Sequence, residues 1–255
     1  MIMSPVTPKR IFRILGVAGQ HDAAARVLEE AIALCRQIGA STDPILGGAL
    51  GDLSTALSAL GRRQESLVAL EQAVAINRRL PDGGVNLATC LSNLADWQAR
   101  LGNPDRGVPA AQEALAIREK LFGTNSSPVA FSHARLGQIL IAATNYPAAR
   151  LHIEQALQIG QATMQPRHRN FQFLLRQLGT LELREGQAEA AEKTLREARS
   201  IASENYGATH AATRYNGCLL AEALAALGRN RDARDLLAAS ISVVTRDFLD
   251  DTGVR

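Results

Sequence analysis

The sequence predicts an all-α protein made of about six helix-turn-helix repeats stacked into a solenoid. Three observations indicate this fold: columns of small residues, of turn residues and of aliphatic residues recur every 41 or 42 positions along the chain. A fixed period of this length is the signature of an array in which each unit packs on its neighbours. A poverty of aromatic residues, 4% of the chain, also disfavours a β-sheet.

Two of the columns hold small residues and lie seven positions apart. The first is Ala24, Ser66, Gly107, Ala149, Ala191 and Ala233, and the second is Ala31, Ala73, Ala114, Ala156, Ala198 and Ser240. Positions seven apart lie two turns apart on one face of a helix. Small side chains there let a neighbouring helix approach closely, so we expect both columns to be buried between helices.

A third column holds the turn of each repeat, and two more hold aliphatic residues. The turn column is Gly19, Gly61, Gly102, Thr144, Gly186 and Gly228. The first aliphatic column is Leu34, Ile76, Ile117, Ile159, Ile201 and Val243. The second is Ile11, Leu53, Leu94, Leu136, Leu178 and Leu220. A glycine between two helices takes the positive φ of a helix end and lets the chain reverse. The aliphatic residues are expected to fill the space between helices.

The columns predict the helices and the domain organisation. The expected helix pairs are about 8–18/22–38, 45–60/64–80, 86–101/105–121, 128–143/147–163, 169–185/188–204 and 209–227/231–247. They define one solenoid over residues 1–249, with repeats at about 8–39, 44–81, 85–123, 127–165, 167–207 and 208–248, and a frayed tail over 250–255.

Composition and charge limit the function. The net charge of +3 over 255 residues is too small to demand a nucleic-acid partner. Cys35, Cys90 and Cys218 form no CxxC pair, which indicates reduced, buried cysteines in a cytoplasmic protein. No stretch approaches the roughly 20 apolar residues of a membrane span. The arginine- and alanine-rich composition is typical of a GC-rich, bacterial genome.

Motifs for catalysis are weak. The glycine-rich run at 47–51 follows no strand and matches neither a dinucleotide fingerprint nor a P-loop. The histidines show no metal-ligand spacing, so we expect no enzyme activity, no cofactor and no metal. The basic run Arg167-His168-Arg169 is interpreted as a solvated loop rather than a contact for phosphate or an acidic partner.

Two segments resemble a known family. In 136–157 and 178–198, the pairs Leu136-Gly137 and Leu178-Gly179 and the small residues that follow have the spacing of tetratricopeptide repeats. The longer period and segments such as 114–130 and 198–212 resemble the kinesin-light-chain type. Leu57, Gln98, Leu140 and Glu182 stand where the family commonly has tyrosine. The resemblance implies a right-handed superhelix that binds protein partners, with the first helix of each pair on the concave surface.

The first helices carry candidate binding residues. In the fifth repeat, Phe173, Arg176, Gln177, Thr180 and Arg184 form one stripe, while Leu174, Leu175, Leu178 and Leu181 form the opposite, buried side. Equivalent positions are Asn93, Asp96 and Arg100 in the third repeat, Phe131, Arg135 and Gln138 in the fourth, and Tyr215 and Glu222 in the sixth. Phe131, Phe173 and Tyr215 recur every 42 positions, and we call them the aromatic ladder.

Aromatic residues and arginines are favoured anchors at protein interfaces. The stripe therefore predicts a groove on a scaffold or adaptor, for a peptide or protein partner with acidic and apolar residues. An alternative is that the aromatic side chains only pack between adjacent first helices. Two other functions stay open: a peptide-sensing domain of a larger bacterial signalling protein, and a structural subunit that oligomerises through an uncapped apolar end at Val243, Val244, Phe248 and Leu249.

Overall fold

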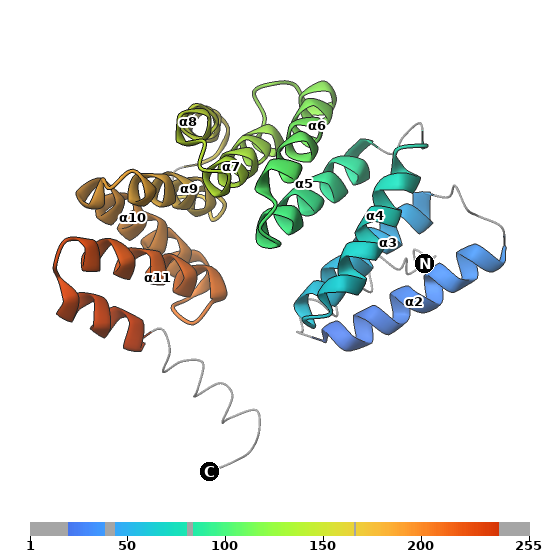
Figure 1. Ribbon diagram of the computed structural model, residues 1–255, viewed down its shortest axis with the longest axis horizontal. Helices are drawn as coiled ribbons and strands as arrows, with labels where there is room; N and C mark the ends of the chain where they lie inside the picture. Colours follow the sequence, from blue (N-terminus) through green and yellow to red (C-terminus); the bar gives the residue numbers. More distant parts are fainter. Residues whose placement is uncertain (1–19, 39–43, 81–83, 166, 240–255) are drawn as a thin grey trace, which may run out of the picture. The chain divides into compact units, whose positions relative to one another are not determined.

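The structure is a computed structural model that describes residues 20–38, 44–80, 84–165 and 167–239, and every regular element in these ranges is an α-helix (Figure 1). The prediction of an all-α fold is confirmed. Every described helix begins within two residues of its predicted start. The chain divides into two compact units, residues 1–123 and 124–255.

The first unit contains α2 to α6. Their bounds are His21–Gln37 for α2, Pro44–Ala59 for α3, Arg63–Asn77 for α4, Gly84–Arg100 for α5 and Pro104–Phe122 for α6. Helices α3 and α4 form one pair and α5 and α6 the next, while α2 packs on α3 and α4 packs on α5. The helix predicted at about 8–18 lies outside the described residues.

The second unit contains α7 to α11. Their bounds are Ser127–Ala142 for α7, Tyr146–Thr163 for α8, Phe171–Arg184 for α9, Ala188–Tyr206 for α10 and Ala211–Ala226 for α11, and residues 230–239 are also helical. Helix α9 pairs with α10 and also contacts α7 and α11. These contacts place the first helices of three successive repeats next to one another. The apolar end predicted at 243–249 lies outside the described residues.

The turn column adopts the left-handed backbone conformation at every described position. The φ angles are 73° at Gly61, 80° at Gly102, 58° at Thr144, 77° at Gly186 and 75° at Gly228. The four glycines adopt this conformation without steric cost and let the chain reverse between helices, as predicted. Thr144 adopts it despite a β-branched side chain, which makes this turn strained.

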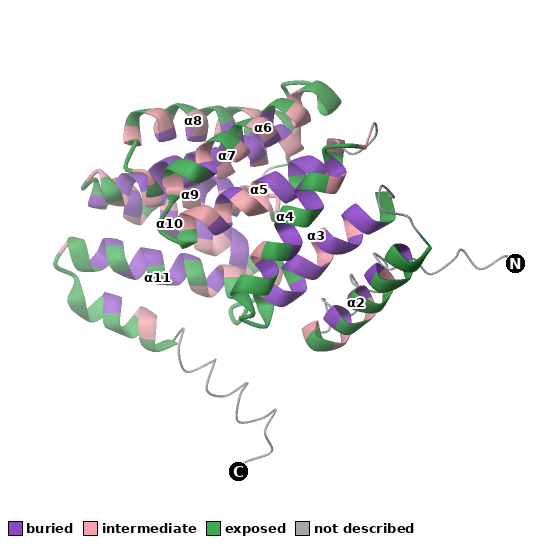
Figure 2. Ribbon diagram, turned by 45° about the vertical axis from the view of Figure 1, so that its right-hand side comes forward, coloured by how far each residue is buried: buried purple, intermediate pink, exposed green. Residues whose placement is uncertain are grey.

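The described members of the small-residue columns are buried where helices meet, except for Ala31, which is half-buried. Figure 2 shows how buried positions recur along each helix. Fully buried members include Ala24, Ser66, Ala73, Ala149, Ala156, Ala191 and Ala198, each 0% exposed. In the fourth and fifth repeats, the glycine that follows the column leucine allows an especially close approach. A Cβ atom on Gly179 would lie 2.5 Å from Cγ of Leu195, and one on Gly137 would lie 2.6 Å from Cγ1 of Ile153.

Among the described members of the two aliphatic columns, Leu34 is an exception. The prediction that this side chain fills an interhelical space is wrong, because Leu34 is 60% exposed. Helix α2 buries a different face, formed by Ala24, Leu28, Ile32 and Cys35. Leu34 does not lie on the face of α2 that packs on α3.

Candidate functional site

The aromatic ladder lies on three neighbouring helices of the second unit. Phe131 is on α7, Phe173 on α9 and Tyr215 on α11. The ring centroids of Phe131 and Phe173 are 5.8 Å apart and their planes are tilted by 30°. Both phenylalanines are half-buried, whereas Tyr215 is 58% exposed. The structure therefore brings together three aromatic side chains that are 42 residues apart in the sequence.

Two arginines contact these rings. The guanidinium carbon of Arg135 lies 5.3 Å from the ring centroid of Phe173. That of Arg176 lies 4.9 Å from the centroid of Phe173 and 5.0 Å from that of Tyr215. These distances fall within the range of a cation–π interaction, about 6 Å. Arg176 thus links the rings of α9 and α11.

The guanidinium of Arg176 has no anionic partner among the described residues. Neither a carboxylate nor a side-chain hydrogen bond acts on it there, although a guanidinium carries five N–H donors. Burial lowers the pKa of Arg176 to about 10; the nearby Tyr215 opposes this shift and the positive charge of Arg135 adds to it. At neutral pH the side chain still carries its positive charge. This arrangement can attract a carboxylate, which pairs with the planar guanidinium through two N–H donors.

Other predicted residues of the second unit have local partners. Nη1 of Arg184 lies 2.7 Å from Oε1 of Glu222, so this exposed ion pair connects α9 to α11. The hydroxyl of Thr180 donates to the backbone oxygen of Arg176 at 2.8 Å. Gln138 is half-buried on α7.

Gln177 does not belong to the accessible surface. Its side chain is only 4% exposed, so its prediction as a groove residue is wrong. One residue along a helix turns the side chain by about 100°, which moves Gln177 from the face of Arg176 toward the packed side. Its amide nitrogen is 3.4 Å from the backbone oxygen of Phe173, to which it donates.

The predicted residues of the third repeat lie on α5, in the first unit. Asn93 and Asp96 are half-buried and Arg100 is exposed. Nε of Arg100 lies 2.7 Å from Oδ2 of Asp96, one helical turn away. The structure pairs these two side chains with each other along α5.

The sequence neighbours of two ladder residues form a buried amide pair that the repeat pattern did not indicate. Nδ2 of Asn216 donates to Oε1 of Gln172 at 2.9 Å and to the backbone oxygen of Ala198 at 3.1 Å. Asn216 is 0% exposed and Gln172 is 7% exposed. They are the sequence neighbours of Tyr215 and Phe173. These two residues are 44 positions apart, which differs from the repeat period of 41 or 42, so they share no column. The sequence signal that could have identified them is a polar residue on the packed side of each helix.

Two residues outside the aromatic ladder bear on earlier expectations: Arg167 is exposed, as expected for a solvated loop, whereas the expectation that all three cysteines are buried is wrong. Arg167 is bound by Glu204, with Nε 2.6 Å from Oε2, and also donates to the hydroxyl of Ser200 at 2.9 Å, so its charge is compensated within the chain. Cys35 and Cys90 are buried as predicted, but Cys218 is exposed. Cys218 lies three residues after Tyr215, on the outward face of α11.

Within the described ranges, no group of three or more histidine, cysteine, aspartate or glutamate side chains is arranged to hold a metal ion. Of the helices that the structure describes, none is both long and apolar enough to cross a membrane.

Comparison with known proteins identifies the family. Models of the tetratricopeptide repeat match residues 46–80, 80–162 and 172–246. The chain belongs to the tetratricopeptide repeat family. No curated protein matches the chain.

Solved structures with the same fold include proteins of the kinesin-light-chain type. A putative kinesin light chain of Podosopora anserina with nearly identical repeats is 20% identical, with a TM-score of 0.59, over 78% of this chain and 94% of that one. BtubC (BKLC) from P. vanneervenii is 19% identical, with a TM-score of 0.64, over 90% and 91%. The apo form of RapI is 15% identical, with a TM-score of 0.66, over 92% and 95%. At these identities the likeness shows the fold.

Proposed function

We propose that the chain is a non-catalytic scaffold or adaptor of the cytoplasm that binds a peptide or protein segment along α7, α9 and α11. The observation that carries this proposal is the position of Arg176, whose guanidinium lies against Phe173 and Tyr215 without an anionic partner among the described residues. A cation that is held in place by two rings is prepared to bind an anion, because little side-chain freedom remains to be lost.

The chemistry of the face defines the segment that would bind there. Arg176 fits an aspartate or glutamate side chain, and the rings of the aromatic ladder fit apolar side chains beside it. The exposed ring of Tyr215 offers contact area at low conformational cost, because a tyrosine has only two side-chain torsions. The proposed ligand is therefore a segment with an acidic residue flanked by apolar residues.

An immobilised array of short peptides tests this proposal. The array contains peptides with acidic, basic or neutral residues beside leucine and phenylalanine, and it is probed with the wild-type chain and with Arg176→Ala. We expect binding to the acidic–apolar peptides and a loss of roughly 1.5–3 kcal/mol in Arg176→Ala, the value of a hydrogen bond to a charged group. Arg231→Ala is the matched control, because Arg231 is an exposed arginine of the same unit outside the ladder.

A second substitution separates binding from packing. Phe173→Ala should weaken binding and also lower the unfolding midpoint, because Phe173 contacts both Phe131 and the two arginines. Full affinity in Arg176→Ala, together with an unfolding penalty in Phe173→Ala, would show that the ladder only packs the first helices. The partner would then bind elsewhere.

A further inference from the structure

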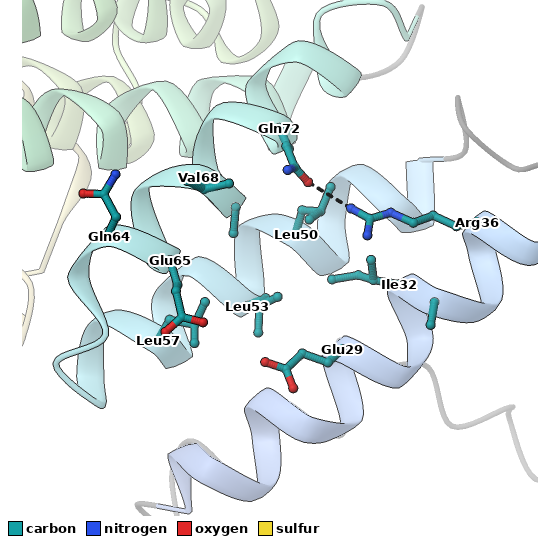
Figure 3. Close-up of a pocket in the computed structure, with 12 residues that line it drawn as sticks. Glu29, Ile32, Arg36, Leu50, Leu53, Leu57, Gln64, Glu65, Val68 and Gln72 are labelled. Atoms are coloured by element: carbon teal, nitrogen blue, oxygen red, sulfur yellow. Dashed lines mark hydrogen bonds between the residues drawn. The ribbon is translucent and has the colours of Figure 1, made fainter.

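The first unit has a recessed surface of its own. A cavity of about 370 Å³ opens between α2 and α4, and the side chains of α3 form its floor (Figure 3). The floor consists of Leu50, Leu53 and Leu57, which lie on one face of α3, and Val68 of α4 forms a wall and is 44% exposed. Ligand pockets span about 300–1,000 Å³, so this cavity is at the lower end of that range.

Charged side chains occupy one end of this cavity, which we call the α2–α4 pocket. Glu29 of α2 and Glu65 of α4 lie there, near Leu53 and Leu57 (Figure 3). Arg62 donates to both oxygens of Glu65, at 2.8 and 2.6 Å, and its Nη2 lies 3.6 Å from Oε1 of Glu29. Two carboxylates thus share one guanidinium, which leaves this end with one uncompensated negative charge.

The opposite end of the pocket has a different character. Nη2 of Arg36 donates to Oε1 of Gln72 at 3.0 Å, so a hydrogen bond spans from α2 to α4 and closes this end. Gln72 is neutral and leaves the positive charge of Arg36 in place. A ligand with several cations would therefore be repelled here, whereas a single cation at the glutamate end is favoured.

The size of the pocket restricts what enters it. A helix with its side chains is about 10–12 Å across, so a cavity of 370 Å³ admits side chains from a partner and not a whole helix. Lysine and arginine have long apolar stems that cover apolar surface while the charged head stays at the polar rim. Val68, which is 44% exposed, offers such a surface in the same pocket as the two glutamates, above the buried Leu53 and Leu57.

We propose that the α2–α4 pocket is a second docking site, which takes one aliphatic side chain and an adjacent lysine or arginine from a segment of another protein. The aliphatic side chain packs on Leu50, Leu53 and Val68. The cation lies between Glu29 and Glu65 and shares these carboxylates with Arg62. This ligand has the opposite charge to the one proposed for Arg176, so each unit would select a different kind of segment.

Two short helical peptides with blocked ends test the assignment. They share the same leucines, and one carries a lysine where the other carries a glutamate beside them. In calorimetric titrations, the lysine peptide should bind the wild-type chain at least about tenfold more tightly than it binds the double variant Glu29→Gln/Glu65→Gln. Val68→Ser, which removes apolar surface without adding a charge, should weaken binding of the same peptide by a similar factor. Binding of the glutamate peptide should depend on Arg176 instead.

The control is Glu30→Gln/Glu71→Gln, which removes two exposed glutamates from the same two helices outside the pocket. It should bind the lysine peptide like the wild type. Equal affinity for the lysine peptide in the pocket variant and this control would overturn the proposal. So would a concentration-dependent mass in sedimentation that Val68→Ser abolishes, because a second copy of the chain would then be the occupant.

Discussion

The imidazole rings of His133 and His152 face each other across α7 and α8, with their Nδ1 atoms 3.0 Å apart. The rings are stacked with centroids 5.2 Å apart, and His133 is only 5% exposed. One Nδ1 can donate to the other only while the acceptor is unprotonated. Burial, together with the neighbouring His152, lowers the pKa of His133 to about 4.

This pair predicts a loss of stability in mild acid. An unfolded chain protonates its histidines near pH 6.5, whereas folded His133 protonates near pH 4, so the unfolded state binds more protons between these values. The free energy of unfolding should therefore fall by about 3 kcal/mol as the pH drops from 6.5 to 4. Chemical denaturation at a series of pH values measures this change in the free energy of unfolding. His133→Leu should flatten this pH dependence, and His21→Asn should leave it unchanged; an equally steep profile in His133→Leu would contradict the assignment.

Glu182 of α9 predicts the opposite dependence on pH. This carboxyl is 8% exposed, and its Oε2 has no hydrogen-bond partner among the described residues. Burial raises its pKa, although Thr194 and Arg150 partly oppose the shift. A raised pKa in the folded state means that this group favours folding at low pH and disfavours it once the folded carboxyl ionises. Glu182→Gln should raise the free energy of unfolding at pH 7 by about 1 kcal/mol.

The matched control for Glu182 is Glu189→Gln, which changes an exposed glutamate of α10. Its stability should stay within about 0.5 kcal/mol of the wild type. The gain in Glu182→Gln should shrink as the pH is lowered, because the wild-type carboxyl then becomes neutral as well. A gain that is independent of pH would mean that the charge of Glu182 is not its cause.

The turn at Thr144 predicts a stabilising substitution. Its φ of 58° is costly for a β-branched residue, by roughly 1–2 kcal/mol. Thr144→Gly should therefore raise the melting temperature, even though glycine also increases the entropy of the unfolded chain. The converse change, Gly186→Thr, places the same side chain at the equivalent turn, where φ is 77°, and should destabilise the protein. If both variants melt like the wild type, the strain at this column is negligible.

Two glycines inside helices predict opposite responses to alanine. A Cβ on Gly179 would lie 2.5 and 2.7 Å from atoms of Leu195, so Gly179→Ala should cost about 1–3 kcal/mol. A Cβ on Gly48 would meet only Asn86, at 3.8 Å, so Gly48→Ala should stabilise α3 by about 0.5–1 kcal/mol. Leu195→Ala should partly rescue Gly179→Ala, because it removes the atoms that clash. Equal melting temperatures for the two alanine variants would contradict the close approach of α9 and α10.

The sequence predicted the helices because each repeat follows the same packing rule. The small residues Ala156 and Ala198 and the turn glycine Gly186 are each required by a backbone geometry that recurs, so their columns could be recognised without any structure. The alignment of Phe131, Phe173 and Tyr215 followed from the same period. The pairing of His133 with His152 could not be predicted, because it depends on how two helices of one repeat are rotated against each other.

Gln177 and Leu34 show where the pattern misleads. The steps of three, one, three and four residues along α9 predict that Gln177 belongs to the binding stripe. In the structure, the single step from Arg176 instead places Gln177 in the packed interface. Leu34 occupies an aliphatic column, but the face of α2 that packs on α3 is a different one. Periodicity identifies the residues that share a face, whereas the depth of each residue in the interface depends on the neighbouring helix.

The hydrogen bond between Gln172 and Asn216 has a consequence for the thermodynamics of association. Because these buried amides are the sequence neighbours of Phe173 and Tyr215, sliding α11 along α9 would break their bond and leave polar groups unpaired in the core. The rings that contact Arg176 are thus already held at the distance at which they would meet a ligand. For the segment proposed to bind here, less ordering entropy would be lost on complex formation. Removing this buried bond should therefore weaken that binding without any change in the exposed side chains of the proposed site.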